Sequence, residues 1–333
     1  MNIDVHAHFV PPALRDELGR GKHGFPSVKS GLDNGALRIA FCGNEPKRPV
    51  ATSFSDVEAR HKWMAEARVD KQIVAGWLDM FGYELPADEG ADWSRYLNEQ
   101  MREGVANVPF LAPLATVPLQ SGKHAAKVLA EALDAGHRGA MIGTQPKGLT
   151  GVLDDPDLDP LWELASERKA VLYVHPTFGA RDDRLKAYGL VSAIGRIVDT
   201  TIAVARLLYS GHLTRYPGVR LVLSHGGAAL PMALGRLRQS YATAPANNAD
   251  PMEGFSKLYF DTAVYDPRTI RYICDMSDAS RVMMGTDQPF AIAEQQPVRQ
   301  LEACDLTPAA RAKILGGNAA ELFGIKAALA VNG

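Results

Sequence analysis

Short runs of aliphatic and β-branched residues alternate along the chain with segments whose apolar residues recur every three or four positions. The first pattern predicts buried strands and the second predicts amphipathic helices. The predicted strands cover residues 3–6, 72–77, 110–116, 139–143, 170–175, 220–224, 258–262 and 281–285. The predicted helices cover residues 56–69, 92–106, 122–135, 156–169, 197–213, 231–242, 267–276 and 308–315. Eight strands that alternate with helices indicate an α/β fold, a parallel (β/α)8 TIM barrel.

Two segments break this alternation. Residues 9–55 are rich in glycine and proline, so we expect a long irregular insertion after strand 1. Residues 177–196 form a shorter excursion after the fifth strand. Loops at the carboxyl ends of barrel strands lie over the active face, so both segments could contact a substrate; the alternative is that they are plain surface loops. No Gly/Ser linker divides the chain, and we expect one domain over residues 1–333.

The composition excludes several classes of protein. Hydrophobic residues make up 46% of the 333 positions, and 36 Lys and Arg balance 38 Asp and Glu for a formal net charge of -2. No basic excess favours binding to nucleic acid or to an anionic membrane. The N-terminus lacks a signal-peptide pattern and no window is apolar enough to span a membrane, so we expect a cytoplasmic protein. The three cysteines predict reduced thiols.

Histidines follow the predicted strands at several places. His6 and His8 end strand 1, and residues two apart on a strand point to the same side, so both imidazoles can reach one metal ion. This short motif alone is weak, because it matches by chance. The other strand ends change that: His175 ends strand five, His225 ends strand six and Asp287 follows strand eight. Since the carboxyl ends of barrel strands meet on one face, the sequence predicts a metal site there.

The predicted ligands suit one divalent ion. Imidazole and carboxylate favour Zn²⁺, and Mn²⁺, Fe²⁺ or Co²⁺ accept the same donors. His6, His8, His175 and Asp287 would leave coordination positions open, as in a catalytic site. His225 would then lie beside the metal as a general acid or base. Strand four ends Ala140-Met141-Ile142-Gly143-Thr144 without the lysine that a bridged second metal needs, so we expect a single ion.

These residues, taken in order, resemble a known family. The motifs are Ile3-Asp4-Val5-His6-Ala7-His8, Gly139-Ala140-Met141-Ile142-Gly143-Thr144, Val174-His175-Pro176, Ser224-His225-Gly226-Gly227, Phe260-Asp261-Thr262-Ala263-Val264, Gly285-Thr286-Asp287-x-Pro289-Phe290 and Gly317-Asn318-Ala319. They resemble the amidohydrolase superfamily, in its branch around 2-amino-3-carboxymuconate-6-semialdehyde decarboxylase. The resemblance implies metal ligation by His6, His8, His175 and Asp287, with His225 as the catalytic histidine.

The resemblance also implies substrate-binding residues and a homodimer. Arg48 and Arg236 match two arginines of that family that bind the substrate, the second across a dimer interface. Guanidinium suits a planar carboxylate, although a solvated surface charge is the plain alternative for each. Thr177 and Gln288 depart from the pattern of the semialdehyde decarboxylases, and the stretch around Thr177 is closer to salicylate-type decarboxylases. Both positions lie on the predicted substrate side and leave the substrate itself open.

The sequence therefore predicts a metal-dependent, non-oxidative decarboxylase of a small unsaturated or aromatic carboxylic acid. Asp287 or His225 would deliver the proton to carbon, and the two arginines would orient the acid. The alternative is a hydrolase or hydratase that uses metal-activated water, with Asp287 as the general base. A third reading is a metal-binding barrel without catalysis, which the complete ligand set disfavours.

Overall fold

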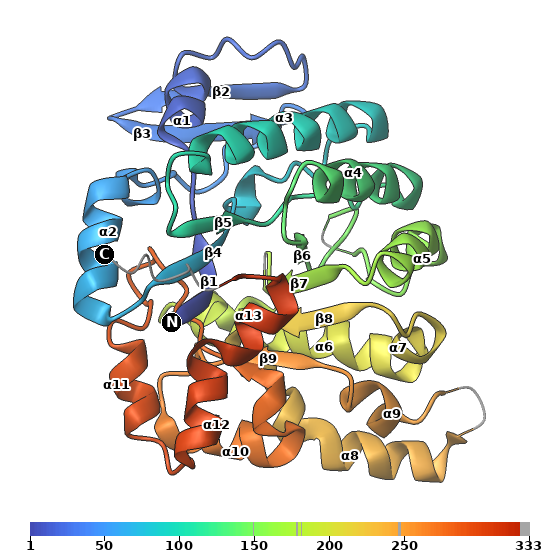
Figure 1. Ribbon diagram of the computed structural model, residues 1–333. Coiled ribbons are helices and arrows are strands. Elements are labelled where there is room, and N and C mark those ends of the chain that lie inside the picture. Colours follow the sequence, from blue (N-terminus) through green and yellow to red (C-terminus); the bar gives the residue numbers. More distant parts are fainter. Residues whose placement is uncertain (149, 178, 181, 246–247, 327–333) are drawn as a thin grey trace.

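The computed structural model describes residues 1–148, 150–177, 179–180, 182–245 and 248–326. Within these residues, eight parallel strands form the inner wall of the protein (Figure 1). They are β1 (Ile3–His8), β4 (Lys71–Ala75), β5 (Leu111–Pro113), β6 (Ala140–Gly143), β7 (Val171–His175), β8 (Arg220–Leu223), β9 (Tyr259–Asp261) and β10 (Val282–Met283). Their apolar side chains are almost fully buried on both faces, as is typical of strands covered by helices.

The strands pair in two runs, β1-β4-β5 and β10-β9-β8-β7-β6, and backbone hydrogen bonds join the runs at both ends. Between β5 and β6, the N–H of Ala115 donates to Gly139 O at 2.8 Å and the N–H of Met141 donates to Ala115 O at 2.9 Å. Between β10 and β1, the N–H of Val5 donates to Met284 O at 2.9 Å. The strands therefore close into a ring, and the predicted barrel is confirmed.

Helices cover the outside of the ring (Figure 1). They are α2 (Val57–Ala67), α3 (Ala87–Val105), α4 (Gly122–Asp134), α5 (Asp159–Glu167), α6 (Arg196–Tyr209), α7 (His212–Arg215), α8 (Leu230–Thr243), α9 (Pro251–Phe255), α10 (Pro267–Ser277), α11 (Pro297–Glu302), α12 (Pro308–Ala312) and α13 (Asn318–Phe323). The helix predicted over 197–213 is divided into α6 and α7 because Gly211 adopts a φ of 71°. No helix of the described ranges is long and apolar enough to cross a membrane. The cytoplasmic location stays a prediction.

The insertion after β1 is more regular than the sequence analysis expected. It contains α1 (Pro12–Gly19) and an antiparallel hairpin of β2 (Val28–Asp33) and β3 (Ala36–Phe41). Asn34 and Gly35 both have positive φ, 49° and 78°, which a tight hairpin turn requires. The expectation of an irregular segment was wrong because this Asn-Gly pair was not read as a hairpin signal. Leu37, Ile39 and Phe41 point inward and pack with residues of α3.

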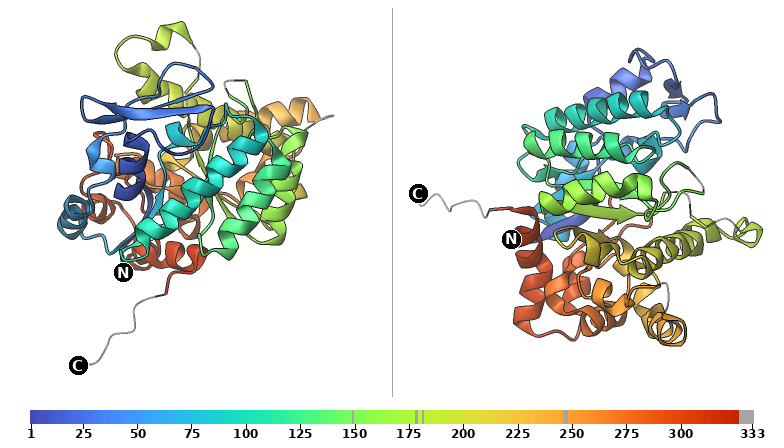
Figure 2. Two further views of the ribbon diagram at one scale, coloured as in Figure 1. Left: turned by 90° about the horizontal axis from the view of Figure 1, so that it is seen from above. Right: turned by 90° about the vertical axis from the view of Figure 1, so that its right-hand side faces the viewer.

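The excursion over 177–196 lies beyond the carboxyl end of β7. It holds a short turn at Asp183–Leu185 and a π-helical turn at Val191–Gly195 that runs directly into α6. Phe178 and Arg181 lie outside the described residues. The yellow-green segment that leads into α6 projects from the body of the molecule in the side view (Figure 2).

Candidate metal centre and active site

The site begins on β1, where His6 and His8 are both fully buried. Residues two apart on a strand share a side, and here both rings face the barrel interior. The Nε2 atoms of His6 and His8 each lie 3.2 Å from Oδ1 of Asp287. Asp287 follows β10 with a φ of 69°, and its N–H donates to His6 O at 2.8 Å. The first and last strands of the ring therefore hold these three side chains together.

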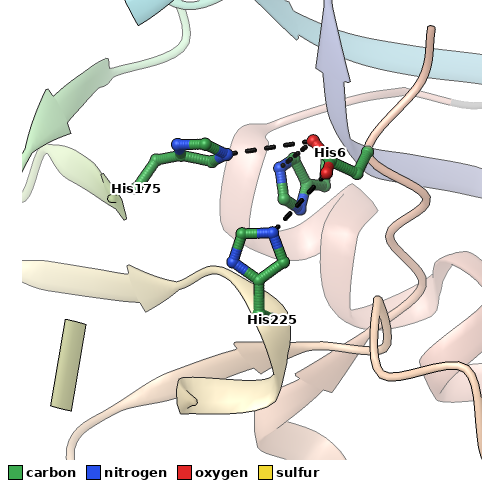
Figure 3. Close-up of side chains that lie close together, drawn as sticks. His6, His175 and His225 are labelled. Carbon is green, nitrogen blue, oxygen red and sulfur yellow. Dashed lines mark ion pairs between the residues drawn. The ribbon is translucent and has the colours of Figure 1, made fainter. Parts of the chain in front are cut away.

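Two further histidines reach the same carboxylate from the opposite part of the ring. His175 is the last residue of β7, and its Nε2 is 3.8 Å from Oδ1 of Asp287. His225 lies just beyond β8, and its Nε2 is 3.6 Å from Oδ2. Figure 3 shows His6, His175 and His225 converging, with dashed lines to the carboxylate.

Ligand atoms of His6, His175, His225 and Asp287 all lie within 4.8 Å of one another. His8 is outside this tightest set, although its ring centroid is 5.0 Å from that of His175. The structure thus brings together all five residues that the sequence analysis predicted for the metal centre and its acid or base.

Each predicted histidine ligand has an oxygen atom beside its Nδ1, the ring nitrogen that points away from Asp287. Nδ1 of His6 is 2.6 Å from Asp261 Oδ2, that of His8 is 3.3 Å from Gly76 O, and that of His175 is 3.0 Å from Pro176 O. An acceptor at Nδ1 keeps the proton there and turns the lone pair of Nε2 inward.

The inward atoms are left without partners. The three Nε2 atoms and Asp287 Oδ1 are buried and have no hydrogen bond to any residue that the structure describes. Buried polar atoms without partners are costly, and three imidazoles with a carboxylate form the donor set of a divalent metal. The residues present therefore fit one metal ion.

His225 differs from the other three histidines. Its Nδ1 is buried without a hydrogen-bond partner among the described residues, so nothing there fixes its tautomer. Its φ is 53°, and the following Gly226 and Gly227 have φ of 62° and 76°. A Cβ on Gly226 would lie 2.5 Å from Val264 Cγ1, so only glycine fits this turn. The turn directs the imidazole at Asp287 without committing it as a ligand.

Asp261 is a residue of the site to which the sequence analysis gave no role. It is fully buried at the end of β9. Besides contacting His6, its carboxylate accepts hydrogen bonds from Tyr173 OH at 2.7 Å and from the N–H of Gly226 at 2.8 Å. It therefore orients His6 and anchors the turn that carries His225. An aspartate at the end of the seventh predicted strand was the signal that could have found it.

A second buried carboxylate, Asp4, lies on β1 two residues before His6. It accepts hydrogen bonds from the N–H of His6 at 3.0 Å, from Gln72 Nε2 at 2.8 Å and from Thr286 Oγ1 at 2.6 Å. Arg60 extends this network by donating to Gln72 Oε1 at 2.7 Å and to His8 O. Burial raises the pKa of Asp4 to about 6, although these hydrogen bonds oppose the rise. The network fixes β1 and the Asp287 segment beneath the metal centre.

The protein alone sets different protonation states on the ligands. Burial lowers the pKa of His8 and lowers that of His175 well below its usual value, so both are neutral. Burial also lowers the pKa of His6, but Asp287 and Asp261 outweigh it and raise this pKa to about 10. Burial raises the pKa of Asp287, yet His6 and the other histidines hold it well below its usual range. A metal would therefore replace one proton, on His6.

Arg48 is engaged in an ion pair with Asp79. Its Nε and Nη2 donate to Asp79 at 2.8 and 2.9 Å, a forked ion pair, and its guanidinium carbon lies 5.2 Å from the ring centroid of Trp77. Asp79 is buried just after β4, so the pair ties the insertion to the rim of the barrel. Nε and Nη2 of Arg48 are thus engaged by Asp79, and substrate binding by Arg48 stays a prediction.

The other three predicted substrate residues lie in different settings. Thr177 is buried, its N–H is 3.4 Å from Thr144 Oγ1, and its own hydroxyl has no hydrogen bond within the described ranges. Gln288 is half-buried, and its amide donates to Gln295 Oε1 at 3.3 Å. Arg236 lies on the exposed face of α8 and forms no hydrogen bond or ion pair with the part of the chain described. A single chain does not bring Arg236 into the site.

Comparisons with known proteins agree with this geometry. Residues 3–325 match the sequence profile of the amidohydrolase family, and the chain belongs to that family. It is 27% identical to 2-amino-3-carboxymuconate-6-semialdehyde decarboxylase of Dictyostelium discoideum, over 98% of this chain and 92% of that protein. The resemblance inferred from the motifs is therefore confirmed.

Solved structures of aromatic acid decarboxylases share the fold. The crystal structure of 5-carboxyvanillate decarboxylase from Sphingomonas paucimobilis matches with a TM-score of 0.80 and 25% identity, covering 98% of this chain and 99% of that one. A dihydroxybenzoic acid decarboxylase from Polaromonas sp. JS666, with bound manganese and 2-nitroresorcinol, matches with a TM-score of 0.77 and 19% identity, over 98% of both chains. The expectation of a metal-dependent decarboxylase agrees with the names of these proteins.

Proposed function

We propose that the protein is a metal-dependent, non-oxidative decarboxylase of a small unsaturated or aromatic carboxylic acid that carries an adjacent hydroxyl, amino or carbonyl group. The observation that carries the proposal is the convergence of three inward Nε2 atoms and one carboxylate oxygen, all without partners in the described chain, beside a fifth group, His225. The decarboxylases to which the chain is similar support this reaction class.

The residues divide into holding and reacting groups. His6, His8, His175 and Asp287 would hold the ion. A divalent ion bound there supplies positive charge that stabilises the electrons left on the substrate when carbon dioxide departs. The buried walls around the ligands exclude water, so charges within the site interact strongly.

Asp287 and His225 share the proton that the reaction needs. Decarboxylation breaks one C–C bond, releases carbon dioxide and leaves an electron pair that must take up a proton. His225 Nε2 and Asp287 Oδ2 are 3.6 Å apart, so a substrate bound beside the pair could take up a proton from either group. The two groups act as one coupled unit, and we propose the pair as the proton donor.

For the metal, we propose one divalent ion with Zn²⁺ or Mn²⁺ as the leading candidates. Three imidazoles and one carboxylate suit zinc, and the related protein from Polaromonas was crystallised with manganese. Metal analysis of the purified protein, followed by stripping and reloading with each ion, decides between them.

A turnover screen tests the reaction. Metal-loaded protein is incubated with hydroxylated and aminated aromatic acids and with muconate semialdehydes, while carbon dioxide and product mass are followed. We expect release of carbon dioxide without uptake of water, and a loss of about 10²- to 10⁴-fold in His225→Gln with unchanged metal content. A product heavier by one water would instead support the hydratase or hydrolase alternative.

We also propose a homodimer formed through the segment around α6. Val191, Ile194, Val198 and Ile202 are exposed and recur every three or four residues along the π-helical turn and α6, so they form an apolar stripe, and the exposed Tyr188 lies in the turn before it. Such stripes mark interfaces. A second copy placed there would also offer its Arg236. Ile202→Asp should give a monomer in sedimentation, whereas Ile292→Asp, at an exposed position elsewhere, should not. A monomeric wild-type protein would refute the proposal.

A further inference from the structure

Arg196, the first residue of α6, lies beside the loop that follows the ligand His175. A Cβ on Gly179 would be only 3.3 Å from the backbone N of Arg196, and the N–H of Ala180 donates to Gly195 O at 2.8 Å. Gly179 itself has a φ of 79°. Two glycines thus let the start of α6 pack directly against the strand-end loop. This packing holds the Arg196 backbone at the rim of the metal centre.

The side chain of Arg196 forms no hydrogen bond or ion pair with any residue that the structure describes. Its Nε is buried and forms no hydrogen bond with the chain as described. The charges close enough to act on it are Arg48, Asp79 and Asp287; burial lowers its pKa most, and Arg48 lowers it further. Asp79 is paired with the fork of Arg48, and Asp287 faces the histidines that would hold the metal with it. Arg196 is therefore a half-buried cation that is paired with no carboxylate of the described residues.

An unpaired Arg196 guanidinium is unfavourable in the absence of a bound anion. A buried charge without a partner costs free energy, which a bound anion would recover. Guanidinium presents parallel N–H donors that match the two oxygens of a carboxylate. Asp79 neutralises Arg48, so Arg196 carries the uncompensated positive charge on this side of the metal centre. A ligand placed between Arg196 and Asp287 would also be within reach of the metal ligands.

We propose that Arg196 binds a carboxylate of the substrate, in addition to the substrate contact that the resemblance implies for Arg48. Arg48 also ties the insertion to the barrel rim through Asp79. The inference rests on the proposed function, because it assumes that the substrate is an acid. It makes Arg196 a specificity-determining residue supplied by the same protomer, independent of any partner subunit.

Binding of two matched probes tests the inference without turnover. Salicylate carries the carboxylate, and salicylamide replaces it with a neutral group of similar shape. Both are titrated by calorimetry into manganese-loaded wild-type protein and into Arg196→Gln, Arg196→Lys and the control Arg206→Gln. Arg206 lies on the same helix and forms an ion pair with Asp154. Because its side chain is half-exposed, we expect Arg206→Gln to have a much weaker effect on ligand binding than Arg196→Gln. Metal content and melting temperature are measured for each variant.

We expect Arg196→Gln to weaken salicylate binding by about 10- to 100-fold while salicylamide binding changes by less than about twofold. Arg196→Lys should retain part of the affinity, and Arg206→Gln should match the wild type. Equal losses for both probes, no loss for salicylate, or no preference of the wild type for salicylate would overturn the inference. Carboxylate binding through Arg196 without turnover of any acid would retract the decarboxylase proposal alone. If the protein turns over an acid but Arg196→Gln binds salicylate as tightly as the wild type, only the role of Arg196 would be retracted.

Discussion

At the scale of single residues, the contact at Nδ1 of each histidine determines whether its Nε2 can bind a metal. His6, His8 and His175 each have an oxygen beside Nδ1, so Nε2 faces inward as a donor for metal. Nδ1 of His225 lacks such a partner among the described residues, and its Nε2 lies 3.6 Å from Asp287 Oδ2. The same type of side chain is thus our proposed ligand at three positions and our proposed proton carrier at the fourth.

Asp261→Asn tests whether Asp261 orients His6 for metal binding. The amide keeps the shape but loses the negative charge that stabilises the Nδ1 proton and makes the ring a better donor. We expect metal affinity to fall by about 10- to 100-fold, measured by competition with a chelator. Asp275→Asn, in an exposed ion pair with Arg271 on α10, is the control and should leave the affinity unchanged. Equal affinity in Asp261→Asn would remove Asp261 from the site.

Metal affinity should rise with pH. The pKa of His6 is raised to about 10 without metal, so below that pH the ion must displace a proton from His6. Depressed pKa values leave His8 and His175 already neutral. We expect about a tenfold gain in apparent affinity per pH unit from about pH 7 to about pH 9, with about one proton released per ion. Calorimetry in buffers of different ionisation enthalpy measures that proton, and a pH-independent affinity would contradict the assignment.

At the scale of elements, sharp turns and one ion pair place the reacting groups. The φ values of 53°, 62° and 76° at His225, Gly226 and Gly227 fold the end of β8 back on the centre. The hairpin of β2 and β3 is fixed to the rim by Arg48 and Asp79. Strand positions could be predicted from the apolar runs, because each run is buried. The hairpin was missed, since its short strands have mixed polarity and only Asn34-Gly35 marks the turn.

A double-mutant cycle on Arg48 and Asp79 tests the anchor. Removing either partner leaves the other without its ion pair, and Asp79 is buried, so Arg48→Met should destabilise the protein. Arg48 is half-exposed, which reduces the effect. We expect a coupling of about 1 kcal/mol between Arg48→Met and Asp79→Asn in urea unfolding of the metal-loaded protein. Additive effects of the two substitutions would contradict the anchor.

At the scale of the whole molecule, the centre connects parts of the chain that are far apart in sequence. β1 supplies His6 and His8, β7 supplies His175 and the segment after β10 supplies Asp287, so an ion held by these residues would crosslink the ring. The convergence of these residues could be predicted from the sequence because strand ends of a barrel meet on one face. Asp261 had the same strand-end signal, but its contact with His6, the setting of Arg196 and the ion pair of Arg48 with Asp79 could not be predicted, since each depends on side-chain contacts between distant segments.

Metal removal should therefore weaken the entire fold. An ion that binds only the folded state stabilises it in proportion to the logarithm of its concentration over its dissociation constant. Dialysis against a chelator should lower the melting temperature by several degrees, and equimolar metal should restore it. His175→Ala should lose most of this response, whereas Ile292→Asp should keep it. An identical melting temperature with and without metal would contradict binding at this centre.

Carbon dioxide release by protein of defined metal content tests the central claim most directly. Stripped protein is titrated with Zn²⁺ or Mn²⁺ and assayed at each step on the best acid of the screen. The account predicts release of carbon dioxide that rises linearly and stops at one ion per chain, and that is lost in His225→Gln at full occupancy. Turnover by stripped protein, or uptake of water without carbon dioxide, would contradict it.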